Sequence, residues 1–300
     1  MLSRRQFIHS AAYACAIPRL LSNPLGLPIG LQLWTVREEL ARDFNGTLRK
    51  IADIGYREVE LFELPLTDPH YRKKNFSDAG LTCVSGHFYL DEFKNPRIID
   101  TASELGLRYM IVVFPTLRSL SDREVSKMKF EELVPLYEKI TLDDYKWNAE
   151  QFNRLGDKLH RNGLQLGYHN HAVDLKQFGD VVAFDALIES TDPRLVTFEM
   201  DCGHVSHAGR NPIEYLRKYP TRIELLHLKD LKPGFETSTT LDTEEKGTNT
   251  EIGSGGIDWT KLFAAAKQGG HVKHYFVEHE GKMDHPPLEA IKISYDYLHR

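Results

Sequence analysis

The chain has 300 residues, of which 41% are hydrophobic, 10% aromatic and 27% charged. This composition is typical of a folded globular protein and excludes a disordered or fibrous chain. The 38 basic and 43 acidic side chains give a net charge of −5, which argues against a nucleic-acid partner because phosphate backbones are anionic. Three cysteines cannot form a disulfide framework, and no apolar run is long enough to span a membrane.

Residues 1–26 have the pattern of an export signal. Arg4 and Arg5 precede a short stretch of small apolar residues at 11–16. This arrangement resembles a twin-arginine signal, which exports proteins that have already folded, often with a metal or cofactor bound. The alternative is a disordered start that contains an arginine pair. The signal predicts a periplasmic or exported protein, and a chain without a functional signal stays in the cytoplasm.

From residue 27 onward, short apolar runs alternate with amphipathic stretches. Strands separated by helices indicate βαβ units and a parallel sheet. No Gly-x-Gly-x-x-Gly motif follows the first strand, so we predict an α/β fold with a single (β/α)8 TIM barrel over residues 27–300. We expect strands at 29–34, 57–62, 82–87, 108–114, 164–169, 195–201, 223–228 and 272–278, and helices at 47–54, 95–105, 143–162, 184–189, 212–219, 259–267 and 287–298.

Imidazole and carboxylate groups follow the last four predicted strands at their carboxyl ends. These ends meet at one mouth of a barrel, where ligands bind. Such groups are costly at the end of an apolar strand unless they are paired or bind a metal. One imidazole or carboxylate from each of four strands suits Mn²⁺, Zn²⁺, Co²⁺ or Fe²⁺ better than Ca²⁺. Each histidine alone could also be an ordinary hydrogen-bonded rim residue. The residues are His169, Asn170, His171, Asp201, His204, His227, Lys229, Asp230, Glu278 and Glu280.

Several short motifs resemble the xylose isomerase-like TIM-barrel superfamily, whose members are commonly called sugar phosphate isomerases/epimerases. They are Asp201-x-x-His204, the tetrapeptide at 227–230, the loop at 253–259 and the closing residues 276–278. The opening residues 30–34 and the segment 55–62 are similar to that family too. The motifs occur in the family's order, so the resemblance covers nearly all of residues 27–300.

The resemblance implies a divalent metal held by Glu, Asp, His and Glu on four successive strands. Asp201, His227 and Glu278 match the last three ligands, and His204 matches a histidine that contacts substrate. At the first position this chain departs from many relatives, because Tyr168-His169-Asn170-His171 stands where they have glutamate. We expect His169 to be the fourth ligand, with Asn170 or His171 turned toward substrate. His171 is the alternative ligand, because alternate residues share a face.

The family's epimerases use two glutamates to remove and return a proton while the metal stabilises an enediolate. The missing glutamate puts this symmetric scheme in doubt. A neutral imidazole can act as a base near pH 7, so Glu278, His169 and His171 are the predicted catalytic residues. The resemblance then implies an isomerase or epimerase that abstracts a proton alpha to a metal-bound carbonyl, with Mn²⁺ as the expected metal and Zn²⁺, Co²⁺ or Fe²⁺ as alternatives.

Two further alternatives stay open on the same scaffold. One is a 3-keto-glycoside lyase that works by β-elimination, and the other is a carbohydrate-binding barrel without catalysis. Abasic-site endonucleases share this barrel, but a net charge of −5 fits them poorly. The long connections at the mouth hold no cluster of arginine or lysine, so we expect an unphosphorylated sugar or sugar derivative as substrate.

Other strand ends supply candidate substrate contacts. Lys229, His87 and Glu60 could face the sugar, and Trp34 could form a platform for its ring or pack in the core. Glu199 shares a face with Asp201, so it could hydrogen-bond a metal ligand or pair with a lysine. His279 and Glu280 are expected at the rim. A homo-oligomer is compatible with this sequence.

Overall fold

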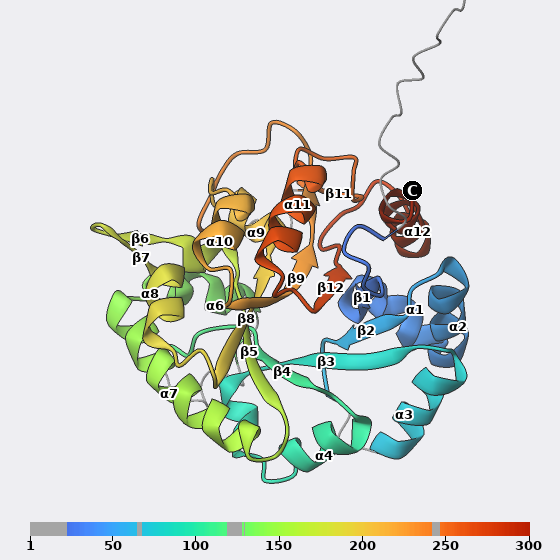
Figure 1. Cartoon of the computed structure of the whole chain (residues 1–300), viewed down its shortest axis with the longest axis horizontal. Helices are drawn as coiled ribbons and strands as arrows, with labels where there is room; N and C mark the ends of the chain where they lie inside the picture. The colour runs from blue at the N-terminus through green and yellow to red at the C-terminus, as the bar shows by residue number, and fades with distance from the viewer. Residues whose placement is uncertain (1–22, 65–67, 119–127, 129, 242–246) are drawn as a thin grey trace, which may run out of the picture.

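The computed structural model describes residues 23–64, 68–118, 128, 130–241 and 247–300. Within this part of the chain, eight parallel strands close into a barrel, and helices surround it (Figure 1). The predicted single (β/α)8 barrel is therefore confirmed. Around the barrel the strands are β1 (Gly30–Gln32), β12 (His274–Val277), β9 (Ile223–Leu228), β8 (Val196–Asp201), β5 (Gln165–His169), β4 (Tyr109–Val112), β3 (Thr82–Phe88) and β2 (Glu58–Leu61).

Helices follow the strands and form the outer layer. Each predicted helix is present, and all but the one at 287–298 differ from the expected bounds at one or both ends. The sequence analysis missed α1, α6 and α9, and it missed α3 because its sequence is polar with a weak apolar stripe. The helices are α1 (Arg37–Arg42), α2 (Phe44–Ile54), α3 (Pro69–Asp78), α4 (Ile98–Leu105), α6 (Phe130–Tyr137), α7 (Leu142–His160), α8 (Ala183–Ser190), α9 (Cys202–His207), α10 (Pro212–Lys218), α11 (Trp259–Gly269) and α12 (Pro287–Leu298).

Short 3-10 helices and two-stranded sheets follow several of the barrel strands. The predicted first strand ends early, because the residues after Gln32 turn into a 3-10 helix, η1 (Leu33–Val36). Two further 3-10 helices are η2 (Leu90–Lys94) and η3 (Ala172–Leu175), and two small hairpins pair β6 (Gln177–Phe178) with β7 (Val181–Val182) and β10 (Asp230–Leu231) with β11 (Asn249–Thr250).

The ends of the described chain meet where the barrel closes. Strand β1 pairs with β12, and α12 lies beside α2 (Figure 1). The Tyr56 hydroxyl donates to the Ile291 carbonyl at 2.8 Å, which ties the two helical layers together. Asn23 accepts a hydrogen bond from the Tyr275 hydroxyl at 2.8 Å and donates its backbone N–H to Leu298. The predicted export signal lies almost entirely outside the described residues.

An apolar plug fills the lower half of the barrel. Tyr109 and Ile111 of β4, Leu225 of β9 and Phe276 of β12 form one buried cluster with Val84 of β3. Burying each such side chain stabilises the fold by roughly 2 kcal/mol. The plug gives the polar residues above it a rigid, dry base, so the site occupies only the carboxyl ends of the strands.

Two irregularities in strand register occur beside buried glutamates. The pairing of β2 with β3 shifts between Val59 and Glu60, and the pairing of β8 with β9 shifts between Phe198 and Glu199. An extra residue in one strand of a pair bends that strand and changes the direction of its side chains. The shifts mark the level at which the barrel interior changes from apolar to polar.

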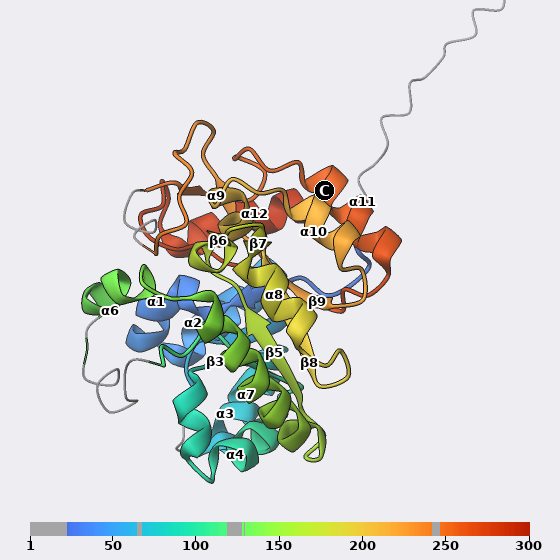
Figure 2. The ribbon, with the colours of Figure 1, turned by 90° about the vertical axis from the view of Figure 1, so that its left-hand side faces the viewer.

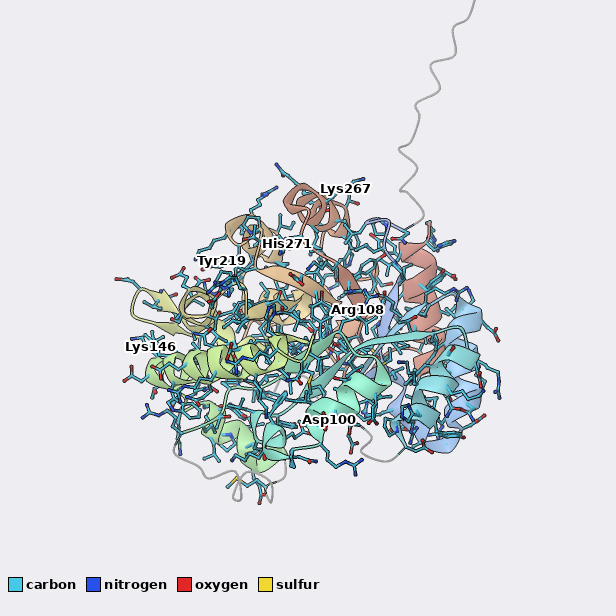
Figure 3. The ribbon with its side chains drawn as sticks, turned by 60° about the horizontal axis from the view of Figure 1, so that its bottom comes forward. Asp100, Arg108, Lys146, Tyr219, Lys267 and His271 are labelled. Carbon is cyan, nitrogen blue, oxygen red and sulfur yellow. The ribbon has the colours of Figure 1, made fainter. Side chains whose placement is uncertain are left out.

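The outside of the barrel is charged and helical. Figure 2 shows α7 and α8 beside β5 and β8, and these helices pack on one another. Figure 3 labels exposed residues on the outer helices, among them Asp100 on α4, Lys146 on α7 and Lys267 on α11. Among the described helices, none combines the length and the apolar character that crossing a bilayer requires.

Candidate active site

Four of the predicted residues meet at the mouth. His169, Asp201, His227 and Glu278 each offer an atom, and these atoms lie within 4.8 Å of one another. We call these four residues the mouth cluster. All four are buried, with at most 3% of their surface exposed. His227 Nδ1 lies 2.9 Å from Glu278 Oε2 and 4.0 Å from Asp201 Oδ2.

Asp201 is fixed in place by the turn that follows β8. Its Oδ1 accepts the His204 backbone N–H at 2.7 Å, which caps α9, and its own N–H donates to Asn170 Oδ1 at 3.0 Å. Asn170 is thus held by Asp201 through its oxygen, while its role toward substrate stays a prediction. Gly203 permits this close turn, because a Cβ there would lie 2.7 Å from the Lys229 Cβ.

Lys229 is buried among the acidic groups of the mouth. Its ammonium Nζ lies 3.0 Å from Asp201 Oδ2, 3.1 Å from Glu278 Oε2 and 3.1 Å from His204 Nε2, and it also donates to Glu280. The ammonium therefore pairs with Asp201 and Glu278, two members of the mouth cluster that a metal ion would also bind. The predicted contact of Lys229 with substrate would take place from this position.

His279 and Glu280 are not rim residues, contrary to the sequence-based expectation. Glu280 is 8% exposed and pairs with Lys229, and His279 is 3% exposed. The chain turns inward after β12 because Thr35 Oγ1 accepts the His279 N–H at 3.0 Å and Asn249 donates to the Glu280 carbonyl at 2.9 Å. These tertiary contacts carry no signal in the local sequence.

His171 and His204 form the outer wall beside His169. The ring centroids of His171 lie 4.9 Å from His169 and 4.8 Å from His204, and Phe114 stacks on the other side at 4.0 Å. Burial, followed by the charge of His204, lowers the pKa of His171 well below its ordinary value, so the ring is neutral. Its Nδ1 is buried without a hydrogen-bond partner among the described residues.

A second polar layer lies beneath the mouth cluster. We call Gln32, Glu60, His87 and Glu199 the floor. Glu60 Oε2 accepts the Gln32 amide at 2.9 Å and lies 3.0 Å from His87 Nε2, and the same His87 nitrogen lies 3.0 Å from Glu199 Oε2. The two glutamates are fully buried. Glu60 and His87 are thus engaged with other protein groups, and their predicted contacts with substrate stay predictions.

Trp34 lies in η1 beside Phe62 rather than at the end of a strand. Its ring meets Phe62 edge-on with centroids 5.5 Å apart, and the Arg37 guanidinium lies 4.1 Å above the ring. One face of the indole is therefore covered by an arginine. A pocket of about 390 Å³ opens nearby, lined by Thr35, Arg37, Glu38, Glu39, Arg42, His279, Gly281, Met283, His285 and Pro287.

Asp230, expected near His227 or the substrate, instead holds a loop. Its carboxylate accepts the N–H groups of Gly253, Gly255 and Ile257 and the Trp259 indole N–H at 2.7 to 3.2 Å. Gly255 is required there, because a Cβ would lie 2.1 Å from Asp230 Oδ1. The motif at 253–259 that resembles the family is therefore a structural clamp.

The buried acids set the electrostatics of the site. Burial raises the pKa of Glu60, but His87 and His227 lower it well below its ordinary value. Lys229 is the main group that lowers the pKa of Glu278 and Glu280 against the effect of burial. These glutamates are therefore ionised at neutral pH. Together with Glu199 and Asp201 they outnumber the nearby cations among the described residues, even with Lys229, His87, His204 and His227 all protonated.

The histidines of the mouth cluster differ in charge. Burial and the neighbouring His227 lower the pKa of His169 well below its usual value, so its ring is neutral. Burial opposes charge on His227 too, but Glu199, Glu278 and Glu60 raise its pKa well above the ordinary value. A cation at Nδ1 of His227 would therefore compete with a proton.

The residues present fit a divalent cation. The cluster offers two imidazoles and two carboxylates at a buried point, a donor set that first-row metals prefer. Asp201 Oδ2 is buried, and it lies 3.0 Å from the Lys229 ammonium without a hydrogen bond of good geometry among the described residues, so a divalent cation would share this oxygen with Lys229. The excess of buried acids also calls for further positive charge.

Comparison with known protein families matches residues 48–300 to the xylose isomerase-like TIM barrel. The chain belongs to this family. The inosose dehydratase of Clostridium botulinum (strain Alaska E43 / Type E3) is 30% identical over 155 residues, which are 49% of this chain and 51% of the relative. The chain thus matches about half the length of this curated relative. The inosose dehydratase of Geobacillus thermodenitrificans is 26% identical over 257 residues, which are 79% of this chain and 82% of the relative.

Solved structures of the xylose isomerase-like barrel superpose well on the chain. A sugar phosphate isomerase/epimerase from Parabacteroides distasonis is 26% identical, with a TM-score of 0.69 over 91% of this chain and 97% of its own. The 3-keto-D-glucoside 4-epimerase from E. coli is 17% identical (TM-score 0.65, 91% and 98% covered). The IOLI protein, with a bound zinc atom, is 16% identical (TM-score 0.64, 90% and 96% covered). The last two likenesses show the fold alone.

Proposed function

We propose that this protein is a divalent-metal-dependent enzyme that removes a proton from the carbon next to a ketone of an unphosphorylated sugar or sugar-like ring. His169, Asp201, His227 and Glu278 would hold the metal. The observation that carries the proposal is their convergence within 4.8 Å in a buried site where acids outnumber cations. The names of several relatives, inosose dehydratase and sugar phosphate isomerase/epimerase among them, support the same chemistry.

A divalent cation in this cluster would polarise the substrate carbonyl and stabilise the charge that develops when the neighbouring C–H bond breaks. His171 is the base that we propose, because it is neutral, lies beside His169 and is not engaged by a protein donor through Nδ1. Its ring takes the proton from carbon, and stacking on Phe114 holds its orientation. Glu278 and His169 are then ligands, and their predicted action as bases is secondary.

For an isomerase or epimerase, the proton returns to a carbon of the same substrate. His171 and Lys229 both lie beside His204, with a ring-centroid distance of 4.8 Å for His171 and an Nζ to Nε2 distance of 3.1 Å for Lys229, so the protein offers two proton-carrying groups at the mouth. In an isomerase, the proton that leaves one carbon to His171 returns from it to the neighbouring carbonyl carbon, and the hydroxyl proton of the first carbon moves to the former carbonyl oxygen. Together the two transfers move the carbonyl by one position without loss of atoms.

Elimination is a second candidate, favoured by the position of Lys229. A protonated group beside the mouth cluster can protonate an oxygen that leaves the carbon beta to the carbonyl. The C–H electron pair then forms the new C=C bond, the C–O bond breaks, and the leaving oxygen takes a proton from Lys229. The dehydratase names of the relatives support this outcome for a hydroxyl leaving group.

The test is proton exchange in D2O with the metal-loaded protein. We expect deuterium to be incorporated at the carbon next to the ketone of an inosose or a 3-keto-glucoside. NMR measures this incorporation. Release of water or of an aglycone would assign elimination, and a moved carbonyl would assign isomerisation. Absence of exchange with both ketones, in a protein that binds one divalent cation, would contradict the proposal.

Two variants sharpen the test. His171→Gln keeps a polar side chain but removes the base, so we expect exchange to fall about 100-fold while the metal stays bound. His274→Gln is the matched control, because His274 lies at the opposite end of the barrel in a pair with Glu58 at 2.8 Å. Export by the N-terminal segment stays a prediction, which cell fractionation with Arg4 and Arg5 replaced by lysine would test.

A further inference from the structure

The floor contacts the two histidines of the mouth cluster from below. Glu199 Oε2 lies 3.1 Å from His169 Nδ1, and Glu60 Oε2 lies 2.6 Å from His227 Nε2. Each contact uses one ring nitrogen of a histidine and leaves the other nitrogen free of that contact. The two acids are fully buried, so water does not compete for these hydrogen bonds.

The contacts decide which nitrogen of each ring can bind a cation. A carboxylate only accepts hydrogen bonds, so the nitrogen that faces it must carry the proton. A protonated ring nitrogen has no lone pair for a metal, and the opposite nitrogen of a neutral imidazole then does. His169 would therefore bind through Nε2. Both nitrogens of His227 face carboxylates, Nε2 facing Glu60 at 2.6 Å and Glu199 at 3.2 Å and Nδ1 facing Glu278 at 2.9 Å. A cation at His227 would therefore displace the proton at Nδ1, while the acids of the floor retain the proton at Nε2.

The floor is itself held by a bridge. His87 Nε2 lies 3.0 Å from both Glu60 and Glu199, so one imidazole links the two carboxylates. Although burial opposes it, the charge of Glu60 and the hydrogen bond with Glu199 raise the pKa of His87 to about 10. The Gln32 amide completes the set on Glu60. The carboxylates therefore have fixed positions before any ligand arrives.

We propose that Glu199 and Glu60 are positioning residues: Glu199 selects the metal-binding tautomer of His169, and both acids hold the Nε2 proton of His227 so that only its Nδ1 can bind a cation. The inference rests on the proposed metal site and assigns its support to one acid from β8 and one from β2. The register shifts beside Glu60 and Glu199 place both side chains in the interior.

The competing use of these residues is a second metal position. His87, His169, Glu199 and His227 also offer atoms within 4.8 Å of one another. A cation there would take the nitrogens that face the floor, and both histidines would have to bridge two metals. Bridging requires each imidazole to lose both ring protons, which is far less favourable than a hydrogen bond to a carboxylate. Zinc stoichiometry separates the two arrangements.

The experiment combines histidine NMR with zinc binding. In ¹⁵N-labelled protein, two-bond ¹H–¹⁵N spectra report which ring nitrogen carries the proton. We expect His169 in the Nδ1–H form, with and without Zn²⁺. In Glu199→Leu we expect a mixture of tautomers and a zinc Kd raised 10- to 100-fold, measured by competition with a chelator. Glu199→Gln keeps an accepting oxygen and should restore most of the affinity.

The matched control is Glu58→Leu. Glu58 also lies on β2 and also pairs with a histidine, His274, at 2.8 Å, but at the opposite end of the barrel. It should lower stability without changing the zinc Kd, which separates a positioning effect from general destabilisation.

Three results would overturn the inference. They are a proton on His169 Nε2 in the parent protein, an unchanged zinc Kd and unchanged spectra in Glu199→Leu, or two zinc ions per chain of which one is lost in His87→Ala. If the parent protein bound no zinc, the proposed function would fail, and the His169 tautomer in the metal-free protein would still decide the inference.

Discussion

The two halves of the barrel contribute different chemistry to one site. Strands β1, β2 and β3 bring Gln32, Glu60 and His87, which contact other protein groups within the floor. Strands β5, β8, β9 and β12 end at the mouth cluster. The second half therefore supplies the candidate ligands and one residue of the floor, Glu199, and the first half supplies the rest of the floor.

This division explains why a charged site can exist above an apolar plug. Five buried acids would repel one another if they were left alone. His87 joins two of them in the floor, and Lys229 joins three at the mouth, namely Asp201, Glu278 and Glu280. Each layer thus has its own internal cation, and the shared residue between them is His227, which contacts both.

The largest expected effect comes from the mouth. Asp201→Asn removes one charged ligand and keeps the cap on α9, because the amide oxygen can still accept the His204 N–H. We expect a loss of metal affinity of at least about 100-fold and a loss of proton exchange of at least about 1000-fold. Asp192→Asn, a half-buried position before the start of β8 and thus at the other end of that strand from Asp201, serves as the control. Normal metal binding by Asp201→Asn would remove Asp201 from the site.

Lys229→Met should destabilise the metal-free protein more than the zinc-bound protein. Without metal, the substitution leaves Asp201, Glu278 and Glu280 without their ammonium, and we expect the free energy of unfolding to fall by about 3 kcal/mol. With saturating Zn²⁺ the loss should shrink, because the ion then neutralises the same oxygens. Chemical denaturation with and without Zn²⁺ measures both values.

The control for this comparison is Lys218→Met. Lys218 pairs with Asp185 at 2.8 Å, but its side chain is 52% exposed, so the change should cost less than about 1 kcal/mol in either state. Equal destabilisation of Lys229→Met with and without zinc would mean that lysine and metal do not share partners.

The smallest expected effects concern pH and two buried groups beside the site. Burial raises the pKa of Asp174 to about 6, so the folded state binds this proton more tightly than the unfolded chain. Asp174 therefore adds stability as the pH falls from about 6 to 4. Burial lowers the pKa of His279 to about 4, so His279 removes stability as the pH falls from about 6.5 to 4.

The two groups change the free energy of unfolding in opposite directions over this pH range. Each change is of order 3 kcal/mol as an upper bound. Relative to the parent, Asp174→Asn should lose more stability between pH 6 and 4, and His279→Gln should lose less. Urea denaturation of the metal-free protein at four pH values in this range measures both. Parallel curves for all three proteins would show that neither group changes its pKa on folding.

The barrel could be predicted from the sequence because its signals are local. Each strand is an apolar run such as 223–228, and each is followed by a helical pattern. The mouth cluster could be predicted too, because Asp201, His227 and Glu278 come at strand ends, where the fold alone brings residues together. The position of a residue at the end of a barrel strand can be predicted without knowing the conformation of any loop.

The rest depends on contacts that the sequence does not encode locally. Gln32 was not singled out, because a single amide at the end of a strand has no distinctive pattern. Glu280 was placed at the rim, but Asn249, from a distant hairpin, holds its backbone inward. The contacts of Glu60 and His87 with His227 and Glu199 were not predicted, because the register shift beside Glu60 that brings it under His227 has no local signal. Such shifts follow from packing of the whole sheet.

The clamp formed by Asp230 has a consequence for how the protein could diversify. One carboxylate directly after β9 gathers four donors from residues 253–259, so the two ends of the intervening excursion are stapled to the same point. The described part of this excursion has anchors of its own, with Ser238 hydrogen-bonded to His207 and Leu241 buried in the cluster around Tyr145, but the strand that bears His227 is held at Asp230 independently of them. Evolution, or an engineer grafting new loops, can thus rewrite what covers the mouth while the chemistry beneath keeps its register.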